Sequence, residues 1–242
     1  MLIPHHAHGQ QAERTLLNPW KKDMNVKIVY DSEAKEGFVR DWGFSCLIEQ
    51  GEWKILFDTG ASGAILTHNL NQFGIQVEDL AIIVLSHKHW DHIGGLRAVL
   101  HPGVAVCLPS SFPLRLKKVI AKKAALVVEV SEPKEIVPGV YSLGEVGRPV
   151  KEQSLVLRTS NGEGVIAVVG GAHPGLEQIM AVARCIGDLH GIIGGFHGFK
   201  QLELLRDMKL IMPCHYTRRR KELLRLYPET TVRCGAGAVL TL

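Results

Sequence analysis

The first hydrophobic positions of the chain alternate with polar ones at a period of two. The runs 26–30, 44–49 and 53–58 are short and apolar at alternate positions, which is typical of strands that pack on one face. The segment 50–52 forms a tight turn between the last two runs. We therefore predict that the fold opens with a β-sheet.

The period then changes to that of a helix. Residues 61–74 predict a helix with Ser62 as its N-cap and Gly74 at its end. The run 80–85 is continuously apolar and has the length of a buried strand. A further helix follows it and ends at Pro102.

Strands and helices alternate from there to the C-terminus. Strands are predicted at 104–108, 126–130, 189–195, 210–214 and near 231–233, and helices at about 113–124, 175–185, 199–207 and 217–226. Residues 132–149 are rich in turn formers, and 153–171 resembles a hairpin that turns at Asn161 and Gly162. Two β-rich stretches, each followed by this alternation, predict an α/β (α+β) fold, a four-layer αββα sandwich.

No internal repeat or linker interrupts residues 24–242, so we predict that they form one domain. Residues 1–23 precede it as a polar extension, which we expect to be mobile. They lack the apolar core of a signal peptide, and no apolar run approaches the length of a membrane span.

The charge balance is mildly basic, with 28 Lys and Arg against 24 Asp and Glu and a net charge of +4. This permits an anionic small-molecule substrate but lacks the dense basic surface typical of nucleic-acid binding. The five cysteines are dispersed, without a C-x-x-C pair, which favours a reducing compartment and a cytoplasmic protein. They are Cys46, Cys107, Cys185, Cys214 and Cys234.

The sequence SHKHWDH at 86–92 places three histidines and an aspartate directly after the buried strand. Residues two apart in an extended turn point the same way, so His87 and His89 can converge on one ion. Asp91 and His92, beyond a bend, can face a second ion beside it. Imidazole and carboxylate ligands suit zinc, iron or manganese, and an all-histidine first pair favours zinc.

This HxHxDH stretch resembles the hallmark of the metallo-β-lactamase superfamily. Further stretches that resemble it follow in order: GFSCLIE, LFDTGAS, IIVLSHKHWDHIGGL, EQSLVL, VVGGAHPG, GGFHGF and MPCHYT. Together they look like the subgroup that includes the 7,8-dihydropterin-6-methyl-4-(β-D-ribofuranosyl)aminobenzene-5′-phosphate synthases and many hydrolases of unassigned substrate. The resemblance runs from about residue 25 to the end, and it implies that Asp58 supports the site without being a ligand.

The resemblance also completes the expected metal ligands. It places His173, which follows the apolar run 165–169, on the first ion beside the histidine pair. It places His215 on the second ion beside Asp91 and His92. The six predicted ligands of two divalent ions are His87, His89, Asp91, His92, His173 and His215.

Two residues are predicted to take part in catalysis. Asp91 would orient the attacking water while it binds the second ion. His197 lies in a glycine-rich turn at a strand end, where it could be a ligand, a proton donor or a substrate contact, and we favour substrate contact or acid catalysis. Cys214, beside His215, fits a small buried strand-end residue better than a nucleophile.

One position departs from the superfamily pattern. Most members carry a bridging aspartate after the strand that matches 165–169, whereas this chain has Gly170, Gly171 and Ala172 there. The cysteine that close relatives usually carry near Gly171 is also absent. Three explanations stay open: fewer bridging ligands, a contribution from Glu152, or tight binding of only one ion.

The expected function is that of a metal-dependent hydrolase, or a related lyase or synthase, in which a metal-activated water attacks a small anionic or phosphorylated molecule. The basic stretch 217–225 could supply a phosphate site at a helix start, although a solvated helix face explains it equally well. The pterin-phosphate synthase is a specific alternative. A nuclease would need an RNA-binding insertion, which the sequence lacks, and no membrane partner is indicated.

Two further alternatives have a different chemistry. Di-iron oxidoreductases of this fold replace the second histidine with glutamate and usually carry a flavodoxin-like domain, so His89 and the chain length argue against them. A non-catalytic binding protein would have a degenerate site. The intact cluster at 87–92 argues against that, whereas the missing aspartate keeps it open.

Overall fold

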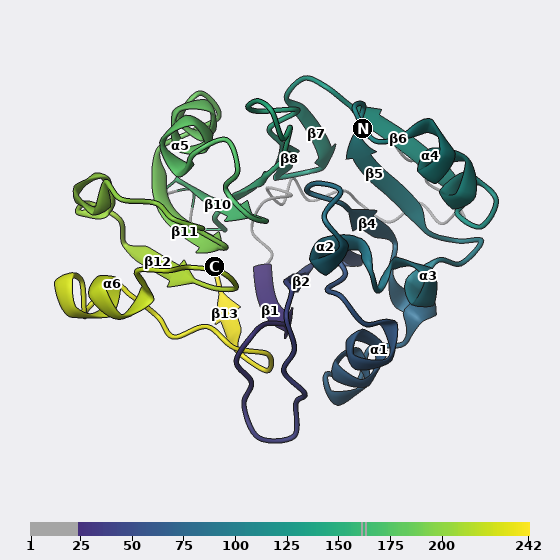
Figure 1. Cartoon of the computed structure of the whole chain (residues 1–242), viewed down its shortest axis with the longest axis horizontal. Helices are drawn as coiled ribbons and strands as arrows, with labels where there is room; N and C mark the ends of the chain where they lie inside the picture. The colour runs from purple at the N-terminus through teal and green to yellow at the C-terminus, as the bar shows by residue number, and fades with distance from the viewer. Residues whose placement is uncertain (1–23, 161, 163) are drawn as a thin grey trace, which may run out of the picture.

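The computed structural model describes residues 24–160, 162 and 164–242, whose strands form two sheets (Figure 1). The first holds β1 (Met24–Tyr30), β2 (Ser45–Gln50), β3 (Trp53–Phe57), β4 (Ile82–Val84), β5 (Ala105–Pro109), β6 (Leu126–Val130) and β13 (Val239–Thr241), in the order β13-β1-β2-β3-β4-β5-β6. The second holds β7 (Lys134–Val137), β8 (Val140–Ser142), β9 (Leu155–Arg158), β10 (Val165–Val169), β11 (Leu189–Gly194) and β12 (Leu210–Pro213), in the order β12-β11-β10-β9-β8-β7.

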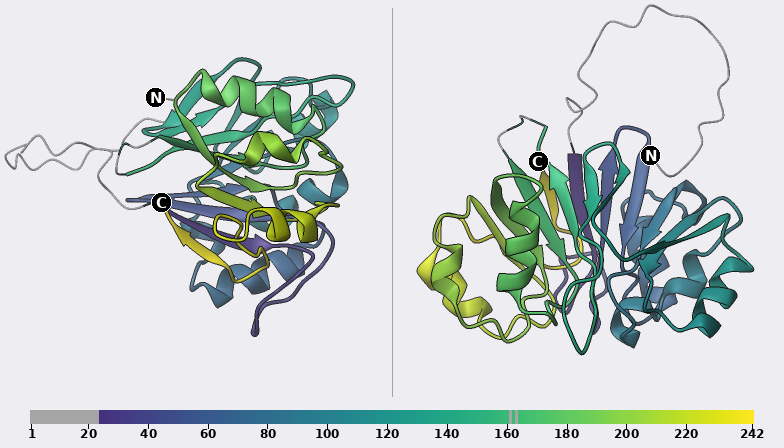
Figure 2. Two further views of the ribbon diagram at one scale, coloured as in Figure 1. Left: turned by 90° about the vertical axis from the view of Figure 1, so that its left-hand side faces the viewer. Right: turned by 90° about the horizontal axis from the view of Figure 1, so that it is seen from above.

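Helices cover the outer face of each sheet, as the view from above shows (Figure 2). Beside the first sheet lie α1 (Gly63–Gln72), α2 (Trp90–Ile93), α3 (Leu96–Val99) and α4 (Leu114–Ala121), with the 3-10 turn η1 (Val77–Asp79). Beside the second lie α5 (Leu176–Arg184) and α6 (Arg220–Leu226), with the 3-10 turn η2 (Leu202–Leu205). The predicted αββα sandwich is therefore confirmed.

Strand β4 shows why its sequence is continuously apolar. Ile82 and Val84 belong to the hydrophobic core between the two sheets, whereas Ile83 packs in the core between the first sheet and its helices. Both faces of the strand are buried, so alternation with polar residues is lost. The strand is thus a rigid base for the residues that follow it.

The strands that precede the histidines run parallel within each sheet. β3, β4, β5 and β6 are parallel neighbours in the first sheet, and β10, β11 and β12 are parallel neighbours in the second. Their carboxyl ends therefore lie at one edge of each sheet. Such edges are where α/β folds bind ligands.

Three predicted elements differ from the structure. The turn-rich stretch 132–149 contains β7 and β8, two short antiparallel strands joined by a turn in which Gly139 has a φ of 80°. The predicted helix 199–207 is reduced to η2. Instead of a strand near 231–233, only an isolated bridge forms at Thr231, and β13 is the last strand. β13 pairs with β1, which lies near the other end of the sequence, and no local pattern indicates this pairing.

Cys214 and Cys234, both buried, form a disulfide with a Cα–Cα distance of 5.1 Å. Their sequence separation of 20 residues gave no indication of this pair. The extension 1–23 and the turn residue Asn161 lie outside the described residues. Among the helices of the described part, none is both long and apolar enough to cross a membrane.

Candidate metal centre

The predicted ligands come together where the parallel strands end. The loop after β4 carries His87 and His89, and α2 carries Asp91 and His92. The turn after β10 carries His173, and His215 follows β12 by two residues. Residues from both sheets thus meet at one edge of the sandwich.

The loop after β4 turns sharply to present its four donors. His87 is fully buried, and His89 has extended backbone (φ −66°, ψ 144°) as the N-cap of the single-turn helix α2. The helical turn then redirects the chain, so that Asp91 and His92 face a different point. The backbone N–H of Phe44 donates to the Asp91 carbonyl at 3.3 Å, which ties this turn to β2.

The first group of donors, which we call the histidine triad, consists of His87, His89 and His173. Their ligand atoms all lie within 4.8 Å of one another. His87 Nε2 is 3.0 Å from His89 Nδ1, and the His173 ring centroid lies 4.4 Å and 4.6 Å from those of His87 and His89. Three imidazoles converging in this way match a tetrahedral site with a fourth position left for a water or substrate.

The second group, the aspartate triad, consists of Asp91, His92 and His215, whose ligand atoms also lie within 4.8 Å of one another. Asp91 Oδ2 is 3.1 Å from His215 Nε2 and 3.9 Å from His92 Nε2. The two triads are adjacent, since the ring centroids of His87 and His92 are 4.2 Å apart. The structure therefore brings together all six predicted ligands in the two predicted groups.

Asp58 lies behind this cluster at the end of β3. Its carboxylate accepts the Ser86 N–H and hydroxyl, each at 2.7 Å, and lies 2.7 Å from His92 Nδ1. With Nδ1 held in this way, His92 presents Nε2 to the aspartate triad. Burial raises the pKa of Asp58 to about 7. A metal ion bound to His92 would oppose this rise, because its positive charge would favour the ionised carboxylate.

Glu152 plays the corresponding part for the histidine triad. Its buried carboxylate accepts the N–H groups of Gly171, Ala172 and His173 at 2.8–3.1 Å, and Oε2 lies 2.9 Å from His173 Nδ1. Burial alone would raise its pKa, but the hydrogen bond from His173, the charge interaction with His87 and the Gly171 N–H outweigh it and lower the pKa to about 2. Glu152 thus orients His173, and both of its carboxylate oxygens accept hydrogen bonds from the turn 171–173.

The turn after β10 lacks the bridging aspartate of the superfamily pattern, and its backbone gives a steric reason for a glycine there. A Cβ on Gly171 would lie 2.5 Å from Cε1 of His173 and 3.3 Å from Cε1 of His87. Glycine at this position lets the two imidazoles approach each other. Ala172 follows it with a φ of 52°, so the turn is tightly bent where Glu152 holds it.

His215 is held by a third buried carboxylate, that of Asp31. The His215 N–H donates to Asp31 Oδ1 at 2.6 Å, and Ser32 Oγ lies 3.1 Å from His215 Nδ1. Trp42, on the loop between β1 and β2 at the bottom of Figure 1, packs edge-on against His215 with ring centroids 4.6 Å apart. Sequence reasoning missed Asp31 and Trp42, because they lie far from His215 in the sequence.

Three of the donors, His87, Asp91 and His92, are in the protonation states that bind metal. Burial is the largest cause that lowers the pKa of both His87 and His92 to about 3, and neighbouring imidazoles lower it further. The Asp91 pKa is held well below its usual range, because hydrogen bonding to His215 and the charge of His92 outweigh the effect of burial. Neutral imidazoles and an ionised carboxylate are the ligand forms.

His197 lies beside the histidine triad but outside it. Its ring centroid is 5.4 Å from that of His173 and 4.4 Å from that of Tyr216. The backbone at His197 has a φ of 46°, a left-handed conformation that few non-glycine residues adopt. Burial, followed by the charges of His173 and Arg218, lowers its pKa, so the ring is neutral at neutral pH.

Sequence comparisons agree with this geometry. The family model described as the metallo-beta-lactamase superfamily matches residues 43–106. An uncharacterized protein of Methanocaldococcus jannaschii is 28% identical over 203 residues, which cover 71% of this chain and 78% of the relative. The 7,8-dihydropterin-6-methyl-4-(beta-D-ribofuranosyl)-aminobenzene-5′-phosphate synthase of the same organism is 27% identical over 237 residues, covering 75% and 80%.

Comparisons with solved structures show the same fold. Tm1679, a metal-dependent hydrolase of the beta-lactamase superfamily, has a TM-score of 0.75 and 23% identity, covering 90% of this chain and 99% of its own. Zn(2+)-bound PqqB from Methylobacterium extorquens has a TM-score of 0.63 and 14% identity, covering 90% and 100%. The matched segment at 43–106, these relatives and the αββα sandwich make the chain similar to the metallo-β-lactamase superfamily.

Proposed function

We propose that the protein is a metal-dependent hydrolase that acts on a small anionic or phosphorylated molecule through a metal-activated water. The observation that carries the proposal is the adjacency of the two triads, each with its own buried carboxylate behind one of its imidazoles. Packing of the hydrophobic core does not require six polar donors held in this way. Related lyase or synthase chemistry would use the same donors.

The donor set fits two divalent ions. Five imidazoles and one carboxylate suit zinc, with manganese or iron as further candidates. The orientation of two of the imidazoles also suits metal binding. Glu152 contacts Nδ1 of His173 and Asp58 contacts Nδ1 of His92, so the Nε2 atom of each ring is left for metal. The zinc-bound PqqB, which shares the fold, supports zinc as the first metal to test.

When bound, two divalent ions would lower the pKa of a water molecule from about 16 toward about 7 and polarise a substrate oxygen. Asp91 is ionised and half-buried, and we propose that it accepts a hydrogen bond from the attacking water and so orients it. A serine or cysteine nucleophile is then not required. Cys214 is unavailable for that role, since it is bonded to Cys234.

The neutral state of His197 bears on its role. A neutral imidazole donates one N–H hydrogen bond, and it is a weaker source of protons than the imidazolium ion. We therefore assign His197 the part of a hydrogen-bond donor to the developing negative charge of the substrate or leaving group. The Arg218 guanidinium, whose Nη2 donates to the Tyr216 hydroxyl at 2.8 Å, adds positive charge on the same side.

The basic stretch 217–225 supports anion binding less than its sequence indicated. Arg219 is paired with Glu222 by two hydrogen bonds of 2.6 Å and 2.7 Å. Arg220 pairs with Glu33 at 2.7 Å. These two arginines stabilise the fold around α6, which leaves Arg218 as the member of the stretch that faces His197 and Tyr216.

A second candidate function is that of a pterin-phosphate synthase, favoured by the 27% identity to that enzyme of Methanocaldococcus jannaschii. It would use the same metal centre on a specific phosphorylated substrate. An assay that mixes the enzyme with the dihydropterin and aminobenzene precursors and follows the product by mass spectrometry distinguishes it from a hydrolase.

The hydrolase proposal is tested with the zinc-loaded full chain and a panel of phosphomonoesters, phosphodiesters, lactones and thioesters. We expect hydrolysis of at least one anionic member, its loss on chelation, and its return on adding zinc. Turnover that persists unchanged in metal-free protein, shown by elemental analysis to hold no zinc, manganese or iron, would refute the proposal. A di-iron oxidoreductase would be indicated by iron as the bound metal and by oxygen consumption.

A further inference from the structure

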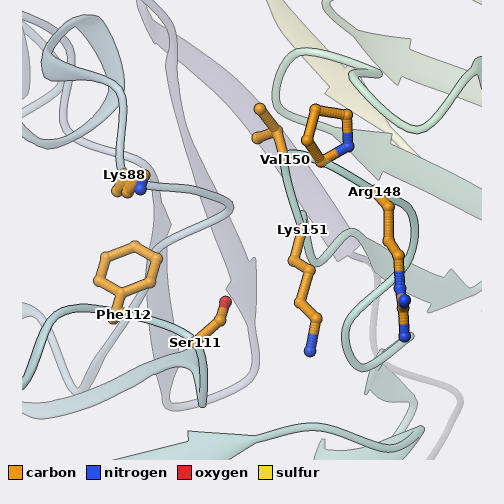
Figure 3. A pocket seen from close by; sticks show the side chains of 7 residues that line it. Lys88, Ser111, Phe112, Arg148, Val150 and Lys151 are labelled. Atoms are coloured by element: carbon orange, nitrogen blue, oxygen red, sulfur yellow. The ribbon is translucent and has the colours of Figure 1, made fainter.

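A pocket of about 710 Å³, lined in part by Lys88 and Lys151, is not used by the mechanism above. Its lining comes from three places in the chain: the loop after β4, the turn after β5 and the segment between β8 and β9. Figure 3 shows two walls that face each other, with Lys88, Ser111 and Phe112 on one side and Arg148, Val150 and Lys151 on the other.

The pocket is connected to the metal centre through the chain itself. Lys88 lies between the two ligands His87 and His89, so its side chain leaves the backbone at the edge of the histidine triad. On the opposite wall, Lys151 immediately precedes Glu152, which holds His173. Along the chain, both walls of the pocket are therefore one residue away from a member or a support of the histidine triad.

The charges that line the pocket are predominantly positive. Lys151 pairs with Glu145 at 2.6 Å, and the other oxygen of Glu145 accepts the Ser111 N–H at 2.6 Å, so this one acid joins both walls. Among the described residues, Lys88 and Arg148 have no ion pair. Three cationic side chains therefore face a single carboxylate, and two of the three are available to a ligand.

The remaining lining of the pocket is apolar. Phe112, which is 4% exposed, lies on one wall, and Pro149 and Val150 form part of the opposite wall. Apolar groups on two facing walls favour a flat hydrophobic group between them, because burying it removes apolar surface from water. The cations at the rim favour an anion on the same molecule.

We infer that this pocket binds the non-reacting part of the substrate, a ring or similar flat apolar group that carries a phosphate or carboxylate held by Lys88 and Arg148. The inference rests on the proposed function for its connection to the metal centre. It adds a specific substrate class, that of aromatic or heterocyclic anions. It also assigns substrate recognition to loops of the first sheet and to the β8–β9 segment.

The test measures binding and needs no turnover. The probe is 8-anilinonaphthalene-1-sulfonate, whose flat body and anionic group match the lining, titrated into the zinc-loaded full chain and followed by fluorescence. The control ligand is N-phenyl-1-naphthylamine, which has the same body without the sulfonate. We expect Arg148→Met and Lys88→Met each to weaken binding of the sulfonate about tenfold while leaving the neutral probe unchanged.

Two control variants locate the effect. Lys122→Met removes an exposed cation at the end of α4, and Arg218→Met removes the cation on the His197 side of the centre. Both should bind the sulfonate like the wild type. Equal binding of the two probes by the wild type would overturn the inference, as would a loss of affinity confined to Arg218→Met. Thermal unfolding and zinc content of each variant separate a folding or metal defect from a lost contact.

Displacement of the probe then identifies the anion. If 1-naphthyl phosphate displaces it more strongly than 1-naphthoate, the pocket prefers phosphate, and the reverse order indicates a carboxylate. Displacement by neutral 1-naphthol at the same concentration as both anions would contradict a charge-selective pocket. A failed pocket would leave metal-dependent hydrolysis intact, and a failed hydrolase assay would leave the binding result intact, so the two outcomes are distinguishable.

Discussion

The loop after β4 and the strand ends of the second sheet contribute to the same candidate metal centre in different ways. The loop supplies four donors within six positions, two for each triad. The second sheet supplies one histidine to each triad, His173 after β10 and His215 after β12. Neither region completes a triad alone, so bound metal would join the two sheets and stabilise their packing.

The two regions also differ in what supports their ligands. Asp58 holds the loop from below through Ser86 and His92, within the first sheet. His173 and His215 instead depend on separate carboxylates, Glu152 and Asp31, each of which also accepts backbone N–H groups. The loop is therefore a single preorganised unit, whereas the second sheet positions its two ligands independently.

The loop side of this comparison is tested most severely by Asp91→Asn. The amide keeps the shape but removes the negative charge that, in our proposal, would bind the second ion and orient the water. We expect turnover to fall by about a thousandfold or more, with little change in the unfolding temperature of the metal-free protein. Steady-state kinetics and calorimetry check this, with Asp207→Asn as an exposed control. Substantial turnover by a fully metal-loaded variant would show that Asp91 has another role.

The strand-end side is tested by His197→Gly, which removes the imidazole and suits the positive φ of this residue. We expect a loss of turnover of about a hundredfold with metal content unchanged, the usual size for a lost hydrogen-bond donor to developing charge. Loss of one ion by elemental analysis would make His197 a ligand. Unchanged kinetics with full metal would make it structural.

A pair of variants sharpens the comparison between the supporting carboxylates. Glu152→Gln should weaken binding at the histidine triad, and Asp58→Asn should weaken binding at the aspartate triad, each by about 10- to 100-fold in metal affinity. Competition with a fluorescent chelator gives the two affinities. If both variants lose the same ion, the carboxylates do not act on separate triads.

The smallest effect expected is a pH dependence of stability in the metal-free protein. His87 and His92 have a pKa of about 3 when folded, against about 6.5 when unfolded, so the unfolded chain binds more protons between those values. Their contribution is present above about pH 6.5 and is lost as the pH falls toward 3. Asp58, with its pKa raised to about 7, acts in the opposite direction, but this one carboxyl group opposes two imidazoles.

We therefore expect the unfolding temperature of metal-free protein to fall when the pH is lowered from about 7 to about 5. Differential scanning calorimetry checks it, with the exposed-site variant His68→Gln as a control that should follow the wild type. An unfolding temperature that rises over this interval would contradict the assignment of neutral, buried imidazoles.

The comparison of the two regions also explains what the sequence could predict. The loop was recognisable without any structure, because its donors are adjacent in sequence and follow a continuously apolar strand. His173 and His215 lie about 80 and 120 residues further on, and only the resemblance to a family joined them to the loop. Asp31 and Trp42 carry no local pattern, since their role depends on the return of the chain to β1.

The same distinction applies to the fold. The alternation of strands and helices predicted the αββα sandwich and most of its elements, including the cap of α1 by Ser62. The features that the sequence did not predict depend on distant partners: β13 pairs with β1, and Cys214 pairs with Cys234. The possible bridging role of Glu152 was a sequence-based alternative, and the structure gives this residue a different task because its oxygens hold the turn 171–173.

The central claim is that the two triads hold two metal ions side by side. The most direct measurement is anomalous X-ray diffraction at the zinc edge from crystals of the zinc-loaded full chain. The account predicts two ions about 3.5–4 Å apart, one about 2.0–2.1 Å from nitrogens of His87, His89 and His173, and the other bound by Asp91, His92 and His215. Zinc that is absent from both triads, or bound elsewhere at full occupancy, would contradict it.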